Sequence, residues 1–122
     1  MKRVLIADND PDARQLVAAS LARIGCDVLI APNGHAAWEL LQSRHPDVAA
    51  LDVAMPGRDG LELTRAIRAD DRLHAMRVVL ISGHADEADL VAGRAAGADR
   101  YVTKPFSPAA LAAVIQELLD IG

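Results

Sequence analysis

Five short, mostly apolar runs alternate with five segments of helical periodicity along this chain, and this alternation restricts the fold more than any other feature. The runs are Val4-Ala7, Asp27-Ala31, Val48-Leu51, Val78-Ser82 and Arg100-Thr103. Strands that alternate with helices predict parallel βαβ units. The first, third and fourth runs are almost wholly apolar, as strands covered by helices on both faces are. We therefore expect a doubly wound α/β fold with these three runs as its central strands.

Helix-capping signals agree with this alternation. We expect helices near residues 11–24, 33–44, 59–69, 86–96 and 108–119. Asp10 and Ser107 are capping residues that each precede a proline at a first helical position, and Gly25 and Gly97 follow helical segments as stops. The last segment carries an apolar stripe that must face the sheet: Leu111, Val114, Ile115, Leu118 and Leu119. The expected organisation is one domain over residues 1–122 with no output domain.

Composition narrows the class of protein. The 122 residues are 52% hydrophobic with a formal net charge of -4, and only three residues are aromatic. An acidic chain without aromatic stacking groups is not expected to bind nucleic acid directly. There is neither a signal-peptide core nor a run of about 20 apolar residues, so we expect a cytoplasmic protein with no membrane span.

Several reactive residue types are expected to have structural roles only. Cys26 is the single cysteine, which excludes an intrachain disulfide and predicts a packing role. His35, His45 and His74 have no partner at metal-ligand spacing, so we expect them at the surface and propose no zinc site. Trp38 lies among apolar helical residues and is expected to be partly buried.

Charged and hydroxylic residues follow the expected strands directly. Asp8, Asn9 and Asp10 follow the first, Asp52 the third, Ser82 the fourth and Lys104 the fifth. In a doubly wound sheet these positions share the carboxyl edge, where ligands bind. Carboxylates from adjacent strands repel unless a cation lies between them, and hard oxygen ligands suit Mg²⁺ or Mn²⁺. The sequence therefore predicts a metal site between Asp8 and Asp52.

The same edge predicts phosphoryl chemistry at Asp52. A metal ion and the Lys104 ammonium would offset the charge of a phosphoryl group and allow the Asp52 carboxylate to attack it. Lys104 is one of only two lysines, and a compact ammonium suits phosphate. Ser82 could donate its hydroxyl to the bound phosphoryl group and draw the following loop inward. Asp10 before Pro11 is explained more simply as a helix cap.

Over its whole length the chain resembles the receiver domain of two-component response regulators. The resemblance is carried by segments in the order of that family: Val4 to Asp12, Leu51 to Gly60, Leu80 to Gly83, Ala96 to Asp99, and Tyr101 to Phe106. It implies a flavodoxin-like fold of five parallel strands in the order 2-1-3-4-5, flanked by five helices. It also implies a phosphorylation-dependent switch that catalyses only its own phosphorylation and dephosphorylation.

The resemblance assigns roles residue by residue. Asp52 would be the phosphoacceptor, Lys104 the phosphoryl-contacting base, Ser82 the switch hydroxyl and Tyr101 the aromatic residue that changes rotamer on activation. The Lys104-Pro105 peptide bond would be cis. Metal ligands would come from Asp8, Asn9, Asp52 and the backbone carbonyl of Ala54. Ala54 and His84 occupy the positions that modulate the lifetime of the phosphoryl bond.

One position departs from the family pattern. The acidic pair of the family falls on Asp8 and Asn9, so its second carboxylate is an amide here. An amide keeps a carbonyl oxygen but loses the charge, which predicts weaker magnesium affinity rather than loss of the site. A one-residue shift would instead make Asp8 the direct ligand or bring in Asp10, and the sequence leaves these alternatives open.

The implied partners are a histidine kinase or histidine phosphotransfer protein and a downstream target of unknown identity. The readout surface would comprise the fourth helix, fifth strand and fifth helix, and phosphorylation-dependent homodimerisation is left open. The main alternative is an interaction module of the same fold that no longer depends on phosphorylation, because Asn9 weakens the metal site. A haloacid-dehalogenase-like phosphatase with Asp8 as nucleophile is more remote, since Pro11 and the absence of a cap segment argue against it. A flavodoxin-like electron carrier is equally remote, since its phosphate loop needs hydroxyls and amides.

Overall fold

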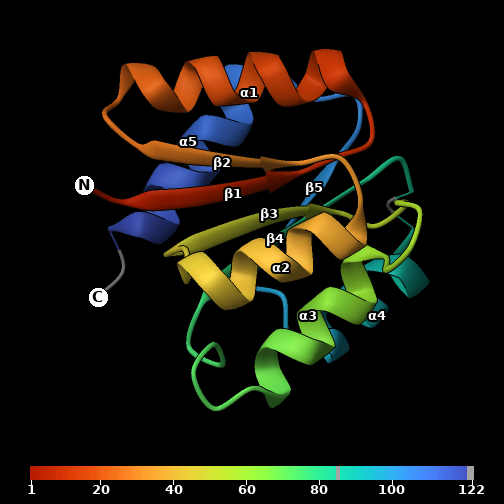
Figure 1. Ribbon diagram of the computed structural model, residues 1–122. Coiled ribbons are helices and arrows are strands. Elements are labelled where there is room, and N and C mark those ends of the chain that lie inside the picture. Colours follow the sequence, from red (N-terminus) through yellow and green to blue (C-terminus); the bar gives the residue numbers. More distant parts are fainter. Residues whose placement is uncertain (85, 121–122) are drawn as a thin grey trace.

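In the computed structural model, residues 1–84 and 86–120 are described, and they form alternating strands and helices (Figure 1). The strands are β1 (Arg3–Ala7), β2 (Asp27–Ala31), β3 (Val48–Asp52), β4 (Arg77–Ser82) and β5 (Arg100–Thr103). The helices are α1 (Pro11–Arg23), α2 (Gly34–Arg44), α3 (Gly60–Ala69), α4 (Glu87–Ala96) and α5 (Pro108–Leu119). Ile121 and Gly122, the last residues of the expected domain, lie outside the described residues.

The strands form one parallel sheet in the order β2-β1-β3-β4-β5. The order reverses between β1 and β3, where Leu5 pairs with Ala49 and Ala7 with Leu51. Side chains of β1, β3 and β4 are buried nearly throughout, as expected for central strands. The predicted fold class and strand order are confirmed.

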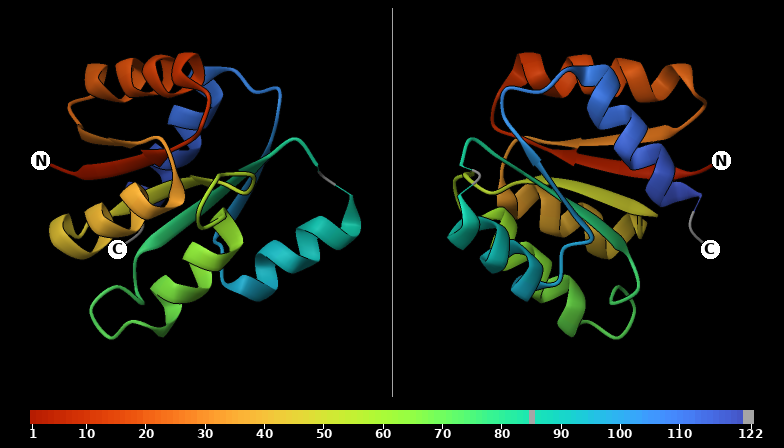
Figure 2. Two further views of the ribbon diagram at one scale, coloured as in Figure 1. Left: turned by 45° about the vertical axis from the view of Figure 1, so that its right-hand side comes forward. Right: turned by 180° about the vertical axis from the view of Figure 1, so that it is seen from behind.

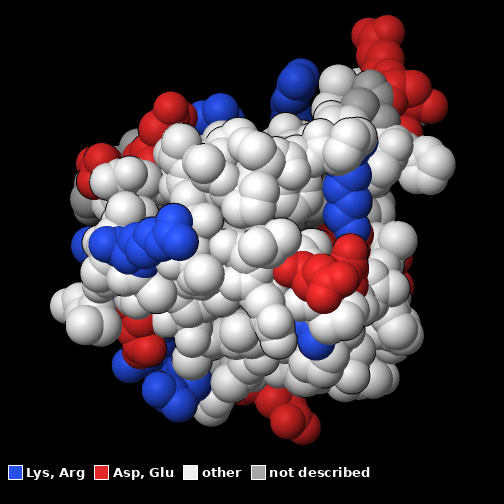
Figure 3. Space-filling model, turned by 90° about the horizontal axis from the view of Figure 1, so that it is seen from above, with Lys and Arg blue, Asp and Glu red and all other residues white. Residues whose placement is uncertain are grey.

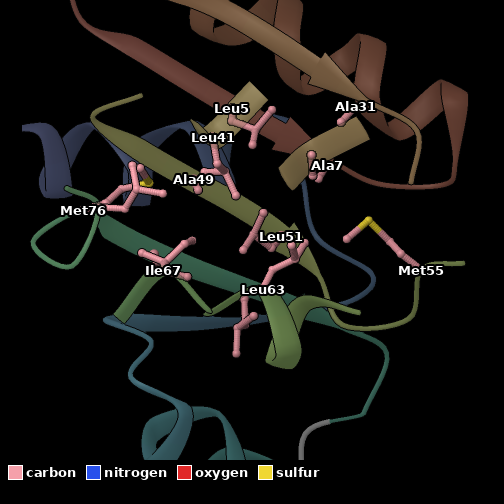
Figure 4. Packing of buried hydrophobic residues seen from close by; sticks show 14 residues of the cluster. Leu5, Ala7, Ala31, Leu41, Ala49, Leu51, Met55, Leu63, Ile67 and Met76 are labelled. Carbon is pink, nitrogen blue, oxygen red and sulfur yellow. The ribbon is translucent and has the colours of Figure 1, made fainter. Parts of the chain in front are cut away.

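Two apolar layers flank the sheet. Helices α1 and α5 cover one face, and α2, α3 and α4 cover the other (Figures 1 and 2). On the second face Leu41 of α2 and Leu63 and Ile67 of α3 pack onto Leu5 and Leu51 of the sheet (Figure 4). The α5 stripe behaves as predicted, because Leu111, Ile115 and Leu118 are buried and Val114 and Leu119 pack against the same layer. Asp8, Asp52 and Ser82 at the carboxyl edge thus lie at the ends of buried strands, whereas Lys104 follows the more exposed β5.

The helix ends are set by local capping contacts. Asp10 caps α1 by accepting hydrogen bonds from the amides of Asp12 and Ala13, and Ser107 caps α5. The expected starts at 33, 59 and 86 are cap residues, so α2, α3 and α4 each begin one residue later. At the end of α4, Gly97 has a φ of 106°, which favours glycine.

At the end of the molecule opposite the carboxyl edge, the guanidinium of Arg68 links several segments by hydrogen bonds. Arg68, in the last turn of α3, donates hydrogen bonds to the carbonyl oxygens of Gly97, His74 and Met76 and to the Asp99 carboxylate. Asp99 also accepts a hydrogen bond from the Val78 amide at 2.7 Å. This network joins α3, the segment before β4, and the turn between α4 and β5.

The residues expected to be structural are placed as predicted. Cys26 is partly buried against the layer under α1 and α5, and burial raises the pKa of its thiol, which disfavours the reactive thiolate. His35, His45 and His74 are exposed, and Trp38 is partly buried. None of the described helices has both the length and the apolar character needed to span a membrane.

Candidate functional site

Asp52 lies at the last position of β3 with its carboxylate in contact with Lys104. The residue is only 2% exposed, and its Oδ2 accepts a hydrogen bond from Lys104 Nζ at 2.9 Å. Its Oδ1 accepts one from the Ala54 amide at 3.1 Å. A buried carboxylate held by one ammonium and one amide is fixed in orientation and can act as a nucleophile, with the ammonium beside one of its oxygens.

Asp8, at the end of β1, shares the same ammonium. Its Oδ2 lies 3.5 Å from Lys104 Nζ, and its Oδ1 accepts a hydrogen bond from the Asp10 amide at 2.9 Å. Burial raises the pKa of Asp8, and Asp52 raises it further, whereas the Asp10 amide and Lys104 oppose the rise. Two buried carboxylates therefore share one cation, and the net effect is an Asp8 pKa above its ordinary value.

Lys104 is held between these carboxylates by the end of β5. Burial opposes its charge, but the hydrogen bonds and charges of Asp52 and Asp8 outweigh this effect and raise the pKa of the ammonium. The Lys104 amide donates to the Ser82 carbonyl oxygen at 2.7 Å, which fixes the backbone beside β4. The Lys104-Pro105 peptide bond is cis, as the resemblance implied.

The neighbours of Asp8 have different surroundings. Asn9 is exposed, and Asp10 uses its Oδ1 to cap α1, as predicted. Arg14 was not singled out from the sequence, yet its guanidinium donates to the Asp8 carbonyl oxygen at 2.8 Å. Because Arg14 lies six residues after Asp8 in the chain, on α1, no local motif marks this contact. It fixes the backbone that carries the Asp8 carboxylate.

Ser82 and Tyr101 meet at the backbone of His84. Ser82 is 5% exposed, and its Oγ accepts a hydrogen bond from the His84 amide at 3.1 Å. The Tyr101 hydroxyl donates to the His84 carbonyl oxygen at 2.8 Å. The predicted switch residues are thus joined through one residue, although the exposed His84 was expected only to modulate hydrolysis.

The loop after Asp52 rests on α2. The Gly34 amide donates to the Pro56 carbonyl oxygen at 3.1 Å, and a side chain at Gly34 would collide with the Arg58 carbonyl oxygen. The Arg58 guanidinium lies 4.8 Å from the centre of the Trp38 ring, a cation–π contact. The loop that carries Ala54 is therefore held against the α2 surface.

The charges around the edge are unevenly distributed. Seen from above, the middle of the face is largely uncharged, an acidic patch lies next to basic atoms on its right-hand part, and further charged side chains lie around the rim (Figure 3). A groove of about 440 Å³ lies beside Lys104 and is lined by the apolar side chains of Leu16 and Phe106 as well as by Asp10. An apolar approach thus leads to a strongly charged site.

The chemistry of the oxygen donors fits a magnesium-type cation. The Asp8 and Asp52 carboxylates are buried, mutually repulsive and served by one ammonium, and both face the carboxyl edge. Within residues 1–84 and 86–120, no three His, Cys, Asp or Glu residues cluster as a metal site. The third position of the expected set is Asn9, whose side chain offers a carbonyl oxygen but no charge. The site is therefore compatible with a hard divalent cation but has one charge fewer than a three-carboxylate site.

With the fold and the geometry of this edge described, the chain can be compared with known protein families. The model for the response regulator receiver domain matches residues 4–116. The chain belongs to the response regulator receiver domain family. Receiver domains are the signalling modules of two-component systems, and the predicted family is confirmed.

Curated relatives are longer than this receiver domain. The transcriptional regulatory protein CseB of Streptomyces avermitilis is 40% identical over 116 residues, which are 95% of this chain and 48% of CseB. The transcriptional regulatory protein GltR of Pseudomonas aeruginosa is 38% identical over 118 residues, 97% of this chain and 49% of GltR. The chain spans about half the length of these relatives.

Solved structures of receiver domains match nearly the whole chain. The chemotaxis response regulator CheY4 of Vibrio cholerae has a TM-score of 0.90 at 29% identity and covers 97% of this chain and 98% of its own. The receiver domain protein from Methanospirillum hungatei has a TM-score of 0.89 at 28% identity, covering 98% and 94% respectively. The likeness thus extends over the complete sheet and its helices.

Proposed function

We propose that Asp52 accepts a phosphoryl group from the phosphohistidine of a histidine kinase or phosphotransfer protein, and that this modification switches the domain. The observation that carries the proposal is the buried Asp52 carboxylate, whose Oδ2 lies 2.9 Å from Lys104 Nζ. An Asp52 oxygen attacks phosphorus, and the bond from phosphorus to the imidazole nitrogen breaks. The imidazole keeps the electron pair and takes a proton from water. Lys104 offsets the charge that develops on the phosphoryl oxygens.

The site would bind Mg²⁺, or Mn²⁺, through the carboxylates of Asp8 and Asp52 and the backbone carbonyl of Ala54, with Asn9 as a weak fourth contributor. When bound, the metal supplies additional positive charge beside the phosphoryl oxygens. Asn9 and the shared ammonium both predict modest affinity, because a cation entering the site finds less uncompensated negative charge than three carboxylates would offer.

The donor would approach along the groove beside Lys104. Leu16 on α1 is 57% exposed, and Phe106 also lines the groove. Exposed apolar side chains next to a charged reaction centre suit a transient complex, because apolar contacts give affinity while the charges orient the reacting groups. We assign the groove to the phosphodonor and place the reaction in the cytoplasm, where two-component kinases act.

Ser82 and Tyr101 would transmit the effect of phosphorylation from the site to the surface. Ser82 Oγ accepts a hydrogen bond from the His84 amide at 3.1 Å, so a movement of this oxygen toward a phosphoryl group on Asp52 would alter how the His84 backbone is held. Tyr101 transmits that change to the surface of α4, β5 and α5. Tyr101→Ala is expected to leave phosphorylation intact and impair binding of the downstream partner. Equal impairment of both would contradict this assignment.

The downstream target is proposed from the family alone. The curated relatives are transcriptional regulators about twice the length of this chain, so control of transcription, through this chain or a partner, is one route of output. We propose no turnover of an external substrate. Asn9 favours a second candidate, an interaction module that works without phosphorylation, because it reduces the charge of the metal site.

Intact mass spectrometry after incubation with acetyl phosphate and MgCl₂ tests the proposal. The parent protein is expected to gain one phosphoryl group, Asp52→Asn is expected to gain none, and Asp8→Asn is expected to gain it more slowly. Ser20→Ala, on the exposed side of α1, is a matched control that should behave like the parent. The absence of any increment at high MgCl₂ would favour the phosphorylation-independent module, and loss in Asp8→Asn alone would favour a phosphatase mechanism.

A further inference from the structure

Tyr101 occupies a defined slot between α4 and the sheet. Its ring packs against the layer that includes Leu80, and its hydroxyl reaches the His84 carbonyl oxygen at 2.8 Å. The His84 amide is bound at the same time by Ser82 Oγ. The position of one aromatic ring therefore decides whether β5 stays linked to the loop that follows the switch hydroxyl.

The slot exists because α4 carries glycine where the ring lies. Gly93 is buried in the middle of α4, which packs beside β5 (Figure 2). A Cβ at this position would lie 2.9 Å from Tyr101 Cδ2, 3.1 Å from Cε2 and 3.3 Å from Leu80 Cδ1. The first distance is shorter than carbon atoms tolerate without movement. Because Gly93 lies within a regular helix and has no positive φ, space rather than backbone conformation explains the glycine.

The ring, rather than the sheet, would move to relieve this contact. Leu80 is fully buried in the central strand β4, whereas Tyr101 is only partly buried. Beside the ring lies a hollow of about 360 Å³, lined by Tyr101, Gly93 and Arg100 among others, which leaves the ring room to move. A ring displaced toward this hollow would carry its hydroxyl away from the His84 carbonyl oxygen.

We propose that Gly93 is a positioning residue of the switch: its lack of a side chain holds Tyr101 in the position in which the hydroxyl binds His84. A methyl group at position 93 displaces the ring and uncouples β5 from the Ser82 loop without touching Asp52. The inference rests on the proposed function only in treating Tyr101 as the relay. Its geometric part concerns the unphosphorylated protein.

The single tyrosine of the chain makes the displacement directly measurable. In protein labelled on the tyrosine ring, NMR should show one set of ring resonances with contacts to the Gly93 Hα protons in the parent. Gly93→Ala should shift these resonances. It should also change the His84 amide resonance, because the carbonyl oxygen of His84 loses its hydrogen bond from the tyrosine hydroxyl. Unchanged ring and His84 resonances would overturn the proposal.

A thermodynamic cycle separates steric displacement from a general effect on α4. Alanine is favoured over glycine in a helix interior by about 1 kcal/mol, roughly five-fold in the folding equilibrium constant. In the parent, Gly93→Ala should not raise the folding equilibrium constant, because the added methyl group collides with Tyr101. In the Tyr101→Ala background, the same substitution should raise it. Ala95→Gly, at an exposed position of the same helix, should lower the constant equally in both backgrounds. An equal effect of Gly93→Ala in both backgrounds would refute the proposal.

The outcome is decided even if Gly93→Ala does not fold. A folded Gly93→Ala/Tyr101→Ala protein would then show that the tyrosine ring caused the failure, whereas an unfolded double variant would place the conflict elsewhere and overturn the proposal. Acetyl phosphate with MgCl₂ is used separately to follow the mass increment at Asp52. Gly93→Ala should keep the parent increment, so failure of the switch geometry and failure of the phosphorylation proposal are distinguishable.

Discussion

Replacing Lys104 by methionine tests whether its ammonium is the cation that allows two carboxylates to remain buried. Methionine keeps the unbranched stem but removes the charge. At an effective dielectric constant of 20, unit charges separated by the observed 2.9 and 3.5 Å attract by about 5 kcal/mol per pair. Lys104 is 31% exposed, so solvent screening and recovered hydration cancel much of this energy. We expect a net loss of about 3 kcal/mol in the free energy of unfolding at pH 7.

The assay is urea denaturation followed by circular dichroism, without divalent metal. The loss should fall to about 1–2 kcal/mol in an Asp8→Asn background, because only the pair with Asp52 is then broken. It should also shrink as pH falls through the raised pKa of Asp8, because the protonated carboxyl group no longer needs the ammonium. Equal losses at pH 7 with and without Asp8 would refute the view that Lys104 neutralises both carboxylates.

Three further outcomes follow from the site and the fold. Asn9→Asp restores a third carboxylate and should raise magnesium affinity roughly ten-fold, about 1.4 kcal/mol, as measured by isothermal titration calorimetry. The same change should lower the stability of the metal-free protein. Unchanged affinity would contradict the assignment of position 9 to the metal site. Folding raises the pKa of Asp8, so at a pH between its ordinary pKa and its raised pKa the folded protein holds more protons than the unfolded protein. The free energy of unfolding therefore falls as pH rises between these two pKa values. Asp8→Asn should therefore stabilise the metal-free protein at pH 7, and a destabilised variant in urea titrations would show that this sign is wrong. Arg68→Ala should lower the free energy of unfolding in urea by about 3 kcal/mol, because three carbonyl oxygens and Asp99 lose the hydrogen bonds from the guanidinium. Arg68→Lys should recover part of this loss. A loss below about 1 kcal/mol would mean that water replaces the guanidinium.

The features predictable from the sequence are those set by nearby residues. Asp10 followed by Pro11, and Ser107 followed by Pro108, begin helices through contacts within three residues, so the starts of α1 and α5 were correct. Starts at 33, 59 and 86 were one residue early because a cap residue and a first helical residue cannot be separated by periodicity. Burial of β1, β3 and β4 follows from their apolar composition.

Contacts between distant segments were not predictable in the same way. Arg68 binds Asp99, 31 residues away, and Gly34 meets the loop at Arg58, and neither pair has a sequence signature. At the site, the resemblance supplied roles for Asp8 and Lys104 but not the sharing of one ammonium by two carboxylates. That arrangement depends on where three strands end relative to one another, which only the assembled sheet fixes.

The stacking of Arg58 on Trp38 gives the loop after Asp52 an optical probe of its own. Trp38 is the only tryptophan, and the guanidinium lies 4.8 Å from its ring. Any shift of the loop moves a cation across the indole and changes its emission. Stopped-flow fluorescence of the unlabelled protein can therefore time the loop movement against acyl phosphate formation and reveal which of the two comes first.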